Sequence, residues 1–448
     1  MIDQMFTAEN FRRIYDSENR KGVDLAARFF PTLEPFTNAV RGKVQDIRDL
    51  RKLETTLKEN DFEEKLKALK DELGDLKAAK SSAVDDLMAD LNQKVLKSSF
   101  KIFLSQKMGP KGKYVFCIDK EPETFFVIKQ LQLNICRIYG VKQANRHDLV
   151  CQLRDMVGGK FPFEIVRTDI SSFYETIDRK RLVEKIDGDQ LLSPASKKYI
   201  KQVLDSYGAI SGALIGIPRG VGISAYLAEL YLRPLDAAIR SIPGIVLYCR
   251  FVDDIVAVFA RPPAGEDLGS FKSLIVHIIG ESGLSHNALK TSEFNLADHA
   301  IKKFEYLGYR FLIDSEGLAI SPSAAKVAKY RSRLDAAFKD YWREKPVNPR
   351  GAFRGLVGRI KFLTGNTRLA NSKACAVTGV YFNNSLVNDL SGFKALDKRL
   401  KSRITNLKRT SLQRQLKKLK FTTGFEQRRY HNFSSTEMRM IVEAWKHV

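Results

Sequence analysis

Two adjacent carboxylates, Asp253 and Asp254, lie in the run YCRFVDDIVAVF, in which most other residues are aromatic or β-branched. This pattern predicts a strand, a tight turn and a second strand, most of it too apolar to face water. Burying one ionised carboxylate without a partner is costly, and two neighbouring carboxylates also repel each other. We therefore expect a positively charged group at this turn.

A third carboxylate, Asp169, lies in the run FEIVRTDISSFYETID, which predicts a strand through Ile170 and a helix from near Ser172. An aspartate at such a strand end, taken alone, is most often a helix cap or a turn residue. Together with Asp253 and Asp254 it predicts three acidic oxygen ligands at the ends of adjacent strands, the ligands that Mg²⁺ prefers. Two such ions about 4 Å apart can activate a hydroxyl group and hold a triphosphate in line.

Two further stretches could contribute to the same chemistry. The run GIPRGVGISAYLAELYL carries Gly216, Gly220 and Gly222 before a predicted helix, and glycines let a backbone approach a base pair or phosphate closely. For this segment alone, an ordinary loop into a helix is the better interpretation. Lys290 in LSHNALKTSEF follows a predicted turn and could supply a cation or a proton, although a single lysine is usually just solvated. FEYLGYRF then predicts a short hairpin around Gly308.

The elements that must position these residues fall into three regions. Residues 1–106 are predicted as a helical region, residues 107–320 alternate short strands with helices, and residues 321–448 are helical and basic. Strands of the middle region are predicted at KYVFCID, FEIVRTDI, GIVLYCRF, DIVAVFA and YLGYRFLI. The predicted fold class is therefore α+β, flanked by helical regions at both ends.

The first region is predicted as helix over residues 42–106. Leu66, Leu69, Leu73 and Leu76 follow one another at alternating spacings of three and four, with charged flanks. This pattern is typical of an apolar helical seam. A helical hairpin packed on the rest of the chain would explain it, and so would a coiled-coil contact with a partner or a second copy.

The chain is strongly basic, with 75 Lys and Arg against 52 Asp and Glu and a net charge of +23. This excess predicts a polyanionic partner, and no apolar stretch approaches the ~20 residues that a membrane-spanning helix needs. Thirteen basic residues lie between Lys394 and Tyr430, interleaved with Leu and Phe. That suits a helix with one face on the core and the other along a phosphate backbone. Five scattered cysteines and an N-terminal segment without an apolar run predict reduced thiols and a cytoplasmic protein.

In order and spacing, these stretches resemble the motifs of reverse transcriptases, the RNA-directed DNA polymerases. Asp169 matches the motif A aspartate, GIPRGVGISAYLAELYL resembles motif B, and FVDD matches the catalytic tetrapeptide of motif C. HNALKT resembles motif D, and FEYLGYRF is similar to motif E, the primer grip. The resemblance covers residues 107–320, roughly half of the chain, and it is specific because the motifs occur in the family's order.

The resemblance implies a right-hand polymerase. Its ferredoxin-like palm would cover about 160–320, its fingers about 100–160, and the basic C-terminal helices would form a thumb-like domain. It implies Asp169, Ile170, Asp253 and Asp254 as the positions that bind two Mg²⁺ ions, or Mn²⁺ in their place. It implies Lys290 as the general acid for pyrophosphate departure.

The resemblance also implies residues that contact the incoming nucleotide or its templating base pair. Tyr174 would block a ribose 2′-OH and so select deoxynucleotides, and Gly220 would lie where the templating base pair is approached. Arg146 in VKQANRHDLVCQL and Lys113 in PKGKYVF are the implied contacts to the triphosphate.

The chain departs from the family pattern in three places. Arg219 replaces the usual glutamine of motif B, where a guanidinium could grip a template phosphate. Phe251 replaces the commoner tyrosine at the start of motif C, which removes a hydroxyl group but none of the carboxylates. Val115 lies near the place where the family often has arginine, which puts the triphosphate contacts in doubt.

A chain with helical ends and no protease, RNase H or integrase signature most resembles the bacterial defence-associated and abortive-infection reverse transcriptases. That resemblance implies an antiviral role and a dedicated non-coding RNA or other RNA template. It also implies dNTPs and a DNA product, and self-assembly or a second reverse transcriptase subunit. Three alternatives stay open: an untemplated polymerase that extends a protein hydroxyl, an RNA-dependent RNA polymerase, and a non-catalytic RNA-binding scaffold. Tyr174 argues against the second, and the three intact aspartates argue against the third.

Overall fold

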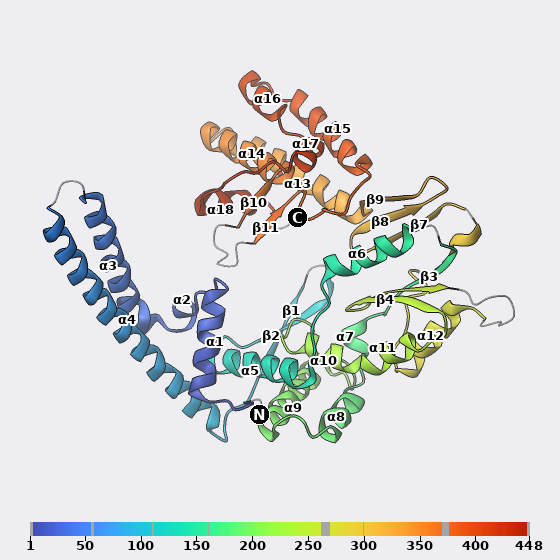
Figure 1. Ribbon diagram of the computed structural model, residues 1–448, viewed down its shortest axis with the longest axis horizontal. Helices are drawn as coiled ribbons and strands as arrows, with labels where there is room; N and C mark the ends of the chain where they lie inside the picture. Colours follow the sequence, from blue (N-terminus) through green and yellow to red (C-terminus); the bar gives the residue numbers. More distant parts are fainter. Residues whose placement is uncertain are drawn as a thin grey trace. The chain divides into compact units, whose positions relative to one another are not determined.

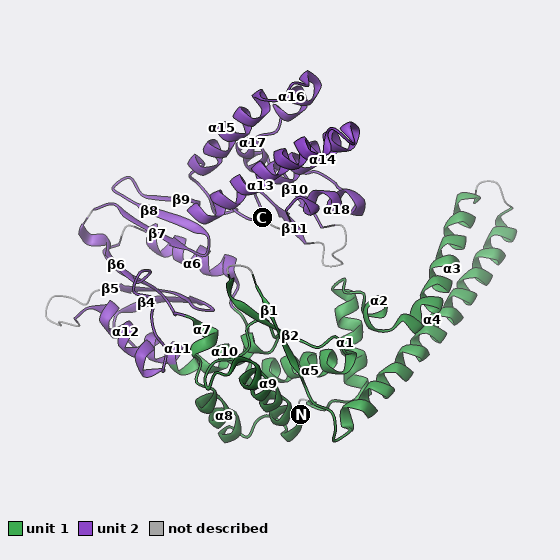
Figure 2. Ribbon diagram, turned by 180° about the vertical axis from the view of Figure 1, so that it is seen from behind, with its two compact units in different colours: residues 1–143, 172–234 green, residues 144–171, 235–448 purple. Residues whose placement is uncertain are grey.

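The computed structural model describes residues 3–54, 58–109, 112–159, 161–260, 269–298, 300–369 and 376–445. The chain divides into two compact units, one of residues 1–143 and 172–234 and the other of residues 144–171 and 235–448 (Figure 2). Each unit combines helices with strands, so the mixed class predicted from the sequence is confirmed. The three domains predicted from the sequence have other boundaries, at 106/107 and 320/321, and they stay a prediction.

The first unit is mainly helical (Figure 1). Its elements are α1 (Ala8–Arg20), α2 (Leu25–Phe29), η1 (Pro31–Leu33), α3 (Glu34–Lys52), α4 (Glu59–Leu96), β1 (Leu104–Met108), β2 (Tyr114–Ile118), α5 (Pro122–Tyr139), α7 (Phe173–Thr176), α8 (Arg179–Gly188), α9 (Pro194–Ser211) and α10 (Ser224–Tyr231).

Helices α3 and α4 form the hairpin that the leucine spacing predicts (Figure 1). Lys43 on α3 and Glu72 on α4 form an ion pair at 2.5 Å. The hairpin interpretation is confirmed, and a coiled-coil contact with a partner stays a prediction. The helix predicted over residues 42–106 extends too far, because α4 ends at Leu96 and residues 104–106 pair with β2 as part of strand β1. Residues 55–57 of that predicted helix lie outside the described residues.

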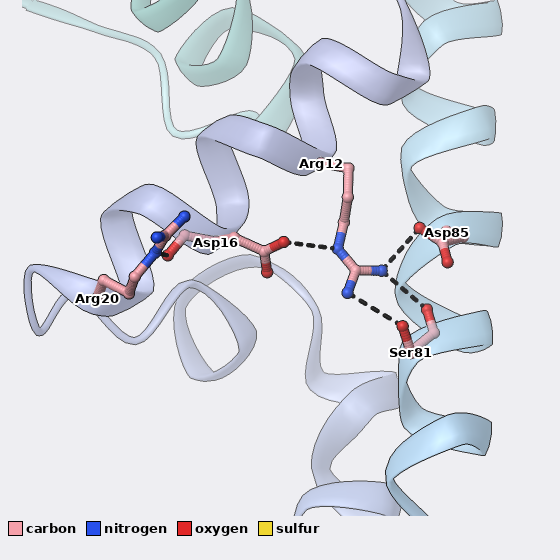
Figure 3. Close-up of polar contacts among 5 residues, drawn as sticks. All are labelled: Arg12, Asp16, Arg20, Ser81 and Asp85. Atoms are coloured by element: carbon pink, nitrogen blue, oxygen red, sulfur yellow. Dashed lines mark hydrogen bonds and ion pairs between the residues drawn. The ribbon is translucent and has the colours of Figure 1, made fainter.

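Helix α1 is fastened to the long helix α4 by one arginine (Figure 3). The Arg12 guanidinium donates to the main-chain carbonyl of Ser81 at 3.0 Å and to Asp85 Oδ1 at 2.7 Å. It also donates to Asp16 on its own helix at 3.2 Å. These contacts fix the root of the hairpin to the body of the unit.

The second unit holds the larger sheets. Its elements are α6 (Arg146–Val157), β3 (Phe163–Asp169), α11 (Arg233–Arg240), β4 (Ile245–Phe251), β5 (Asp254–Ala260), α12 (Phe271–Glu281), β6 (Ser292–Asn295), η3 (Leu296–Asp298), β7 (Lys302–Tyr306), β8 (Tyr309–Ile313), β9 (Leu318–Pro322), α13 (Ala324–Glu344), α14 (Pro349–Thr364), β10 (Asn366–Arg368), β11 (Val377–Gly379), α15 (Ser391–Thr405), α16 (Thr410–Leu416), α17 (Phe421–Glu426) and α18 (Ser435–Glu443).

The central sheet has the strand order β4-β5-β3-β6, and all its neighbouring strands are antiparallel. Both faces of strand β5 are covered, one in the core that includes α6 and the other by α12, so its apolar side chains are buried on both sides. Val258 packs in the core shared with Leu153 of α6, while Phe259 stacks on Phe271 of α12 at a centroid distance of 4.0 Å. This double coverage is why DIVAVFA reads as a continuous apolar run. The predicted strands at all five runs are confirmed.

Two expectations concern the chain's surroundings. Among the helices that the structure describes, none has both the length and the apolar character needed to cross a bilayer. Cys117, Cys136, Cys151 and Cys249 are free thiols, as predicted, and Cys375 lies outside the described residues.

Candidate active site

The three predicted carboxylates come from neighbouring strands of the central sheet. Asp169 is the last residue of β3, Asp254 is the first residue of β5, and the two are directly opposite in the antiparallel register. The main-chain N–H of Ile170 donates to the carbonyl of Asp253 at 3.0 Å. This bond continues the pairing by one step beyond the strands, so all three acidic residues lie where the two central strands β3 and β5 meet at one end.

The turn that carries Asp253 has an unusual backbone. Val252 has a φ of +60°, a left-handed conformation that β-branched residues rarely adopt. Such conformations persist only where the surrounding structure enforces them, and they concentrate at functional sites. Here the strained residue connects β4 to the two carboxylates, which makes the tight turn predicted from the sequence a real feature of the site.

Lys290 lies against these carboxylates, as the motif D resemblance implies. Its Nζ donates to Asp169 Oδ2 at 2.8 Å. The segment before it is tied to β3, because the N–H of Asn287 donates to the carbonyl of Asp169 at 2.7 Å. Lys290 in turn donates its own main-chain N–H to the carbonyl of Asn287 at 3.0 Å. The positive charge expected at the turn is therefore supplied in part by this lysine.

The electrostatics of Asp254 show that the site is short of positive charge. The pKa of Asp254 is raised to about 6, mainly by burial; Asp169 and Asp253 also raise it, while Arg167 and Lys290 oppose the rise. Arg167 Nη2 lies 3.6 Å from Asp254 Oδ1, but that oxygen is buried without a hydrogen-bond partner. A buried acceptor among three repelling carboxylates fits a bound cation.

The carboxylates are not arranged as a closed metal cage. Across the described residues, no three Asp, Glu, His or Cys side chains gather into a group that could hold an ion by themselves. Mg²⁺ is often bound by only one or two carboxylates, and waters or substrate phosphates then complete its coordination. Ile170 has an apolar side chain, so its main-chain carbonyl is the only atom it could offer to a metal.

Four predicted substrate residues belong to the first unit: Lys113, Tyr174, Arg219 and Gly220. The Arg219 guanidinium forms an ion pair with Glu175 at 2.9 Å and lies 5.6 Å from the centre of the Tyr174 ring. Tyr174 is on the short helix α7. Gly220 has a φ of +99°, and a Cβ atom there would lie 2.8 Å from the carbonyl oxygen of Phe116 on β2. The loop thus needs glycine for its own packing, and its approach to a base pair stays a prediction.

The remaining predicted residues have local roles that their sequence context did not indicate. Arg146 begins α6, and its guanidinium donates twice to the carbonyl of Leu307, at 3.1 and 2.5 Å. Lys113 is exposed between β1 and β2. Phe251 ends β4 and pairs with Asp254 across the sheet. Contacts of Arg146, Lys113 and Phe251 to a nucleotide stay predictions.

A comparison with protein families bears directly on this site. Residues 163–311 match the family model described as reverse transcriptase (RNA-dependent DNA polymerase). This part of the chain is therefore similar to a reverse transcriptase domain. The matched residues include Asp169, Asp253, Asp254 and Lys290. They also include Tyr174, Arg219 and Gly220, whereas Lys113 and Arg146 lie outside the match.

Other comparisons give more distant similarities. The chain is similar to the structure of apo telomerase from Candida tropicalis, with 13% identity and a TM-score of 0.40, covering 78% of this chain and 63% of that one. It is also similar to telomerase from Candida albicans in complex with a TWJ fragment of telomeric RNA. That match has 12% identity and a TM-score of 0.38, and it covers 77% of this chain and 59% of that one. The chain therefore spans about three fifths of these telomerase chains. No curated protein matches it.

One residue of the reverse transcriptase domain's site was missed in the sequence. Arg167 lies two residues before Asp169 on β3, and its side chain is only 17% exposed. Its guanidinium forms an ion pair with Asp254. The signal that could have found it is a charged residue inside an apolar strand at the i, i+2 spacing that faces the same side as Asp169.

Proposed function

We propose that the reverse transcriptase domain copies RNA into DNA, adding dNTPs to a 3′-hydroxyl group with Asp169, Asp253 and Asp254 as ligands of two Mg²⁺ ions. The observation that supports this most is the direct pairing of Asp169, at the end of β3, with Asp254, at the start of β5. A second is the raised pKa of Asp254, whose excess negative charge a divalent ion would neutralise. Mn²⁺ offers the same charge and would serve in place of Mg²⁺.

The chemistry proposed for this site is an in-line displacement. A bond forms between the 3′-oxygen and the α-phosphorus of the dNTP as the hydroxyl proton passes to solvent water, and the bond from that phosphorus to the bridging oxygen breaks, releasing pyrophosphate. Divalent ions, when bound, make the hydroxyl a better nucleophile and stabilise the leaving oxygen. Lys290, whose side chain is about half exposed beside Asp169, would give its Nζ proton to the departing pyrophosphate. Tyr174 would exclude a ribose 2′-OH.

We propose that the sheet β4-β5-β3-β6 with α12 is the palm of a right-hand polymerase. The fingers would come from about residues 100–160, and the thumb-like element from the basic helices after residue 321. Strands β7 and β8, joined at Leu307 and Gly308, would serve as the primer grip. On this proposal the three regions 1–106, 107–320 and 321–448 differ in function.

The biological role proposed is bacterial antiviral defence, in the cytoplasm, with a dedicated non-coding RNA. The proposed assembly is a homo-oligomer or a complex with a second reverse transcriptase subunit. The net charge of +23 supports a nucleic-acid partner of some kind. Purifying the chain with its bound nucleic acid and sequencing that nucleic acid would identify the RNA.

The test of the active site is the double variant Asp253→Ala/Asp254→Ala. Incorporation of dNTPs on a primed RNA should fall at least a thousandfold, because both ligands on β5 and its turn are lost, while RNA binding should change little. Glu316→Ala, which removes an exposed carboxylate from the β8–β9 turn, is the matched control and should leave incorporation unchanged. Normal incorporation by the double variant would refute the site. If the DNA made by the parent protein is not complementary to the added RNA, synthesis is untemplated instead.

A further inference from the structure

The second unit contains a pocket of about 460 Å³ that is separate in its residues from the carboxylate site. It is lined by the start of α6, by Tyr309 on β8, by one face of α13 and by Phe382 and Asn383. We call it the basic pocket, because Arg146, His147, Lys326, Lys329 and Arg333 all line it. Positions 326, 329 and 333 follow helical spacing, so one face of α13 supplies three of the cations.

No carboxylate balances these cations among the described residues that line the basic pocket. The pKa of Lys326 is lowered to about 8, first by burial and second by the nearby Arg146. Elsewhere on α13 a carboxylate does balance nearby cations: Asp335 forms ion pairs with Arg399 at 2.5 Å and with Arg403 at 3.0 Å. The fold thus neutralises arginines on one side of α13 and leaves a cluster of cations on the other.

Two of the pocket's cations, Lys326 and Arg146, are held in place by neutral groups. Lys326 Nζ donates to the carbonyl of Asn383 at 2.6 Å and lies 4.6 Å from the centre of the Tyr309 ring. Arg146 is fixed by its two bonds to the Leu307 carbonyl. Carbonyl oxygens and rings position a cation without cancelling its charge. The pocket is therefore preorganised for an anion of the size of a phosphate group.

Aromatic side chains continue from the rim of the basic pocket. Phe382 is 40% exposed, and its ring lies 5.8 Å from that of Tyr430, which is 44% exposed. Tyr430 lines a second pocket of about 510 Å³ together with Arg354 and Lys361. Cations therefore lie on both sides of an exposed aromatic pair. Alternating basic groups and stacking platforms are how proteins hold unpaired nucleotides.

We propose that the basic pocket and the Phe382–Tyr430 pair bind a single-stranded nucleic acid, with a backbone phosphate in the pocket and a base stacked on Phe382. A duplex fits poorly, because its bases are already stacked and cannot reach exposed rings. A free nucleotide would use the first pocket alone, whereas the aromatic pair extends to a second one. This site contains none of the three carboxylates, and binding to it does not require nucleotide incorporation.

The experiment measures binding of a fluorescent twelve-nucleotide oligo(U) to the full chain in EDTA without dNTPs, so loss of polymerase activity would not affect it. Lys329→Glu should weaken binding about tenfold at low salt, because a phosphate contact becomes a repulsion. Phe382→Ala should weaken it about fivefold through the lost stacking. Lys339→Glu is the matched control on the exposed side of α13, and Phe161→Ala is the matched exposed aromatic; both should bind like the parent.

Photocrosslinking with 5-iodouridine in the same oligomer gives a second readout. The crosslinked peptide should contain Phe382 or Tyr430. Equal binding by Lys329→Glu and Lys339→Glu, or crosslinks confined to other peptides, would overturn the proposal. Displacement of the oligomer by millimolar free dTTP would assign the pocket to mononucleotides and overturn the strand assignment.

Discussion

The folded protein disfavours the ionised form of Asp254. Its pKa is raised from 3.8 to about 6, so between these values the folded protein binds the proton more tightly than the unfolded chain. Above pH 6 the ionised carboxylate destabilises the metal-free fold, and below pH 3.8 the effect vanishes because both states are protonated. The full shift corresponds to roughly 3 kcal/mol, at about 1.36 kcal/mol for each pH unit.

The substitution Asp254→Asn should therefore stabilise the metal-free protein at pH 7.5. We expect about 1–2 kcal/mol, less than the full shift, because the contact with Arg167 is also weakened. At pH 4 the gain should nearly disappear. Thermal unfolding in EDTA at the two pH values measures it, with the exposed Asp205→Asn as control. A destabilised variant at pH 7.5 would mean that Arg167 already neutralises the carboxylate.

At the scale of elements, the loop before α10 is shaped by its contact with β2. The N–H of Phe116 donates to the carbonyl of Arg219 at 2.7 Å. A Cβ atom on Gly220 would lie 2.5 Å from Val115 Cγ1 and 2.8 Å from the Phe116 carbonyl oxygen. Since a main-chain oxygen cannot turn away as a side chain can, the loop and the strand can approach this closely only with glycine at this position.

Gly220→Ala should accordingly destabilise the first unit by roughly 2–4 kcal/mol, combining the steric overlap with the strain of a positive φ. Gly188→Ala, at the end of α8, places its Cβ in open space and should be neutral or slightly stabilising. Thermal unfolding and limited proteolysis compare the two variants. Equal stability of both would show that the loop can move away from β2 at little cost.

The elements that were predicted correctly have local signals. Strands β3, β4 and β5 are apolar runs bounded by turns, and a pattern of that kind needs no knowledge of the rest of the chain. Strand β1 was missed because four of its five residues are exposed, so it has no apolar face to recognise. The convergence of Asp169 with Asp254 was predictable because both lie at strand ends.

Long-range contacts were beyond the sequence. Arg146 contacts Leu307, 161 positions away, and nothing near either residue indicates the partner. The basic pocket likewise joins α6, β8, α13 and the segment at 382–383. Residue spacing reveals that α13 has a basic face, but only packing reveals that this face is concave and free of carboxylates among its described lining residues.

For the whole molecule, the net charge of +23 draws nucleic acid to many surfaces at once, so a local contact must be separated from the general field. Lys417, Lys418 and Lys420 are exposed, while Leu416, Leu419 and Phe421 beside them are buried. The exposed lysines and buried apolar residues agree with the prediction, but the helix predicted here is wrong for residues 417–420, which connect α16 to α17. The contact of this segment with a phosphate backbone stays a prediction.

Reversing these three lysines to glutamate tests that contact. Reversing Lys65, Lys67 and Lys70, exposed on α4, changes the net charge by the same amount, so the general field weakens equally in both triple variants. Each phosphate contact contributes about 0.7–0.9 to the slope of log K against log salt. If the C-terminal lysines bind phosphates, their variant should lose about 2–3 from the slope for RNA binding, and the α4 variant much less. Equal slopes would make residues 417–420 a solvated face, and the chain's affinity for RNA would then have to come from other surfaces, the basic pocket first among them.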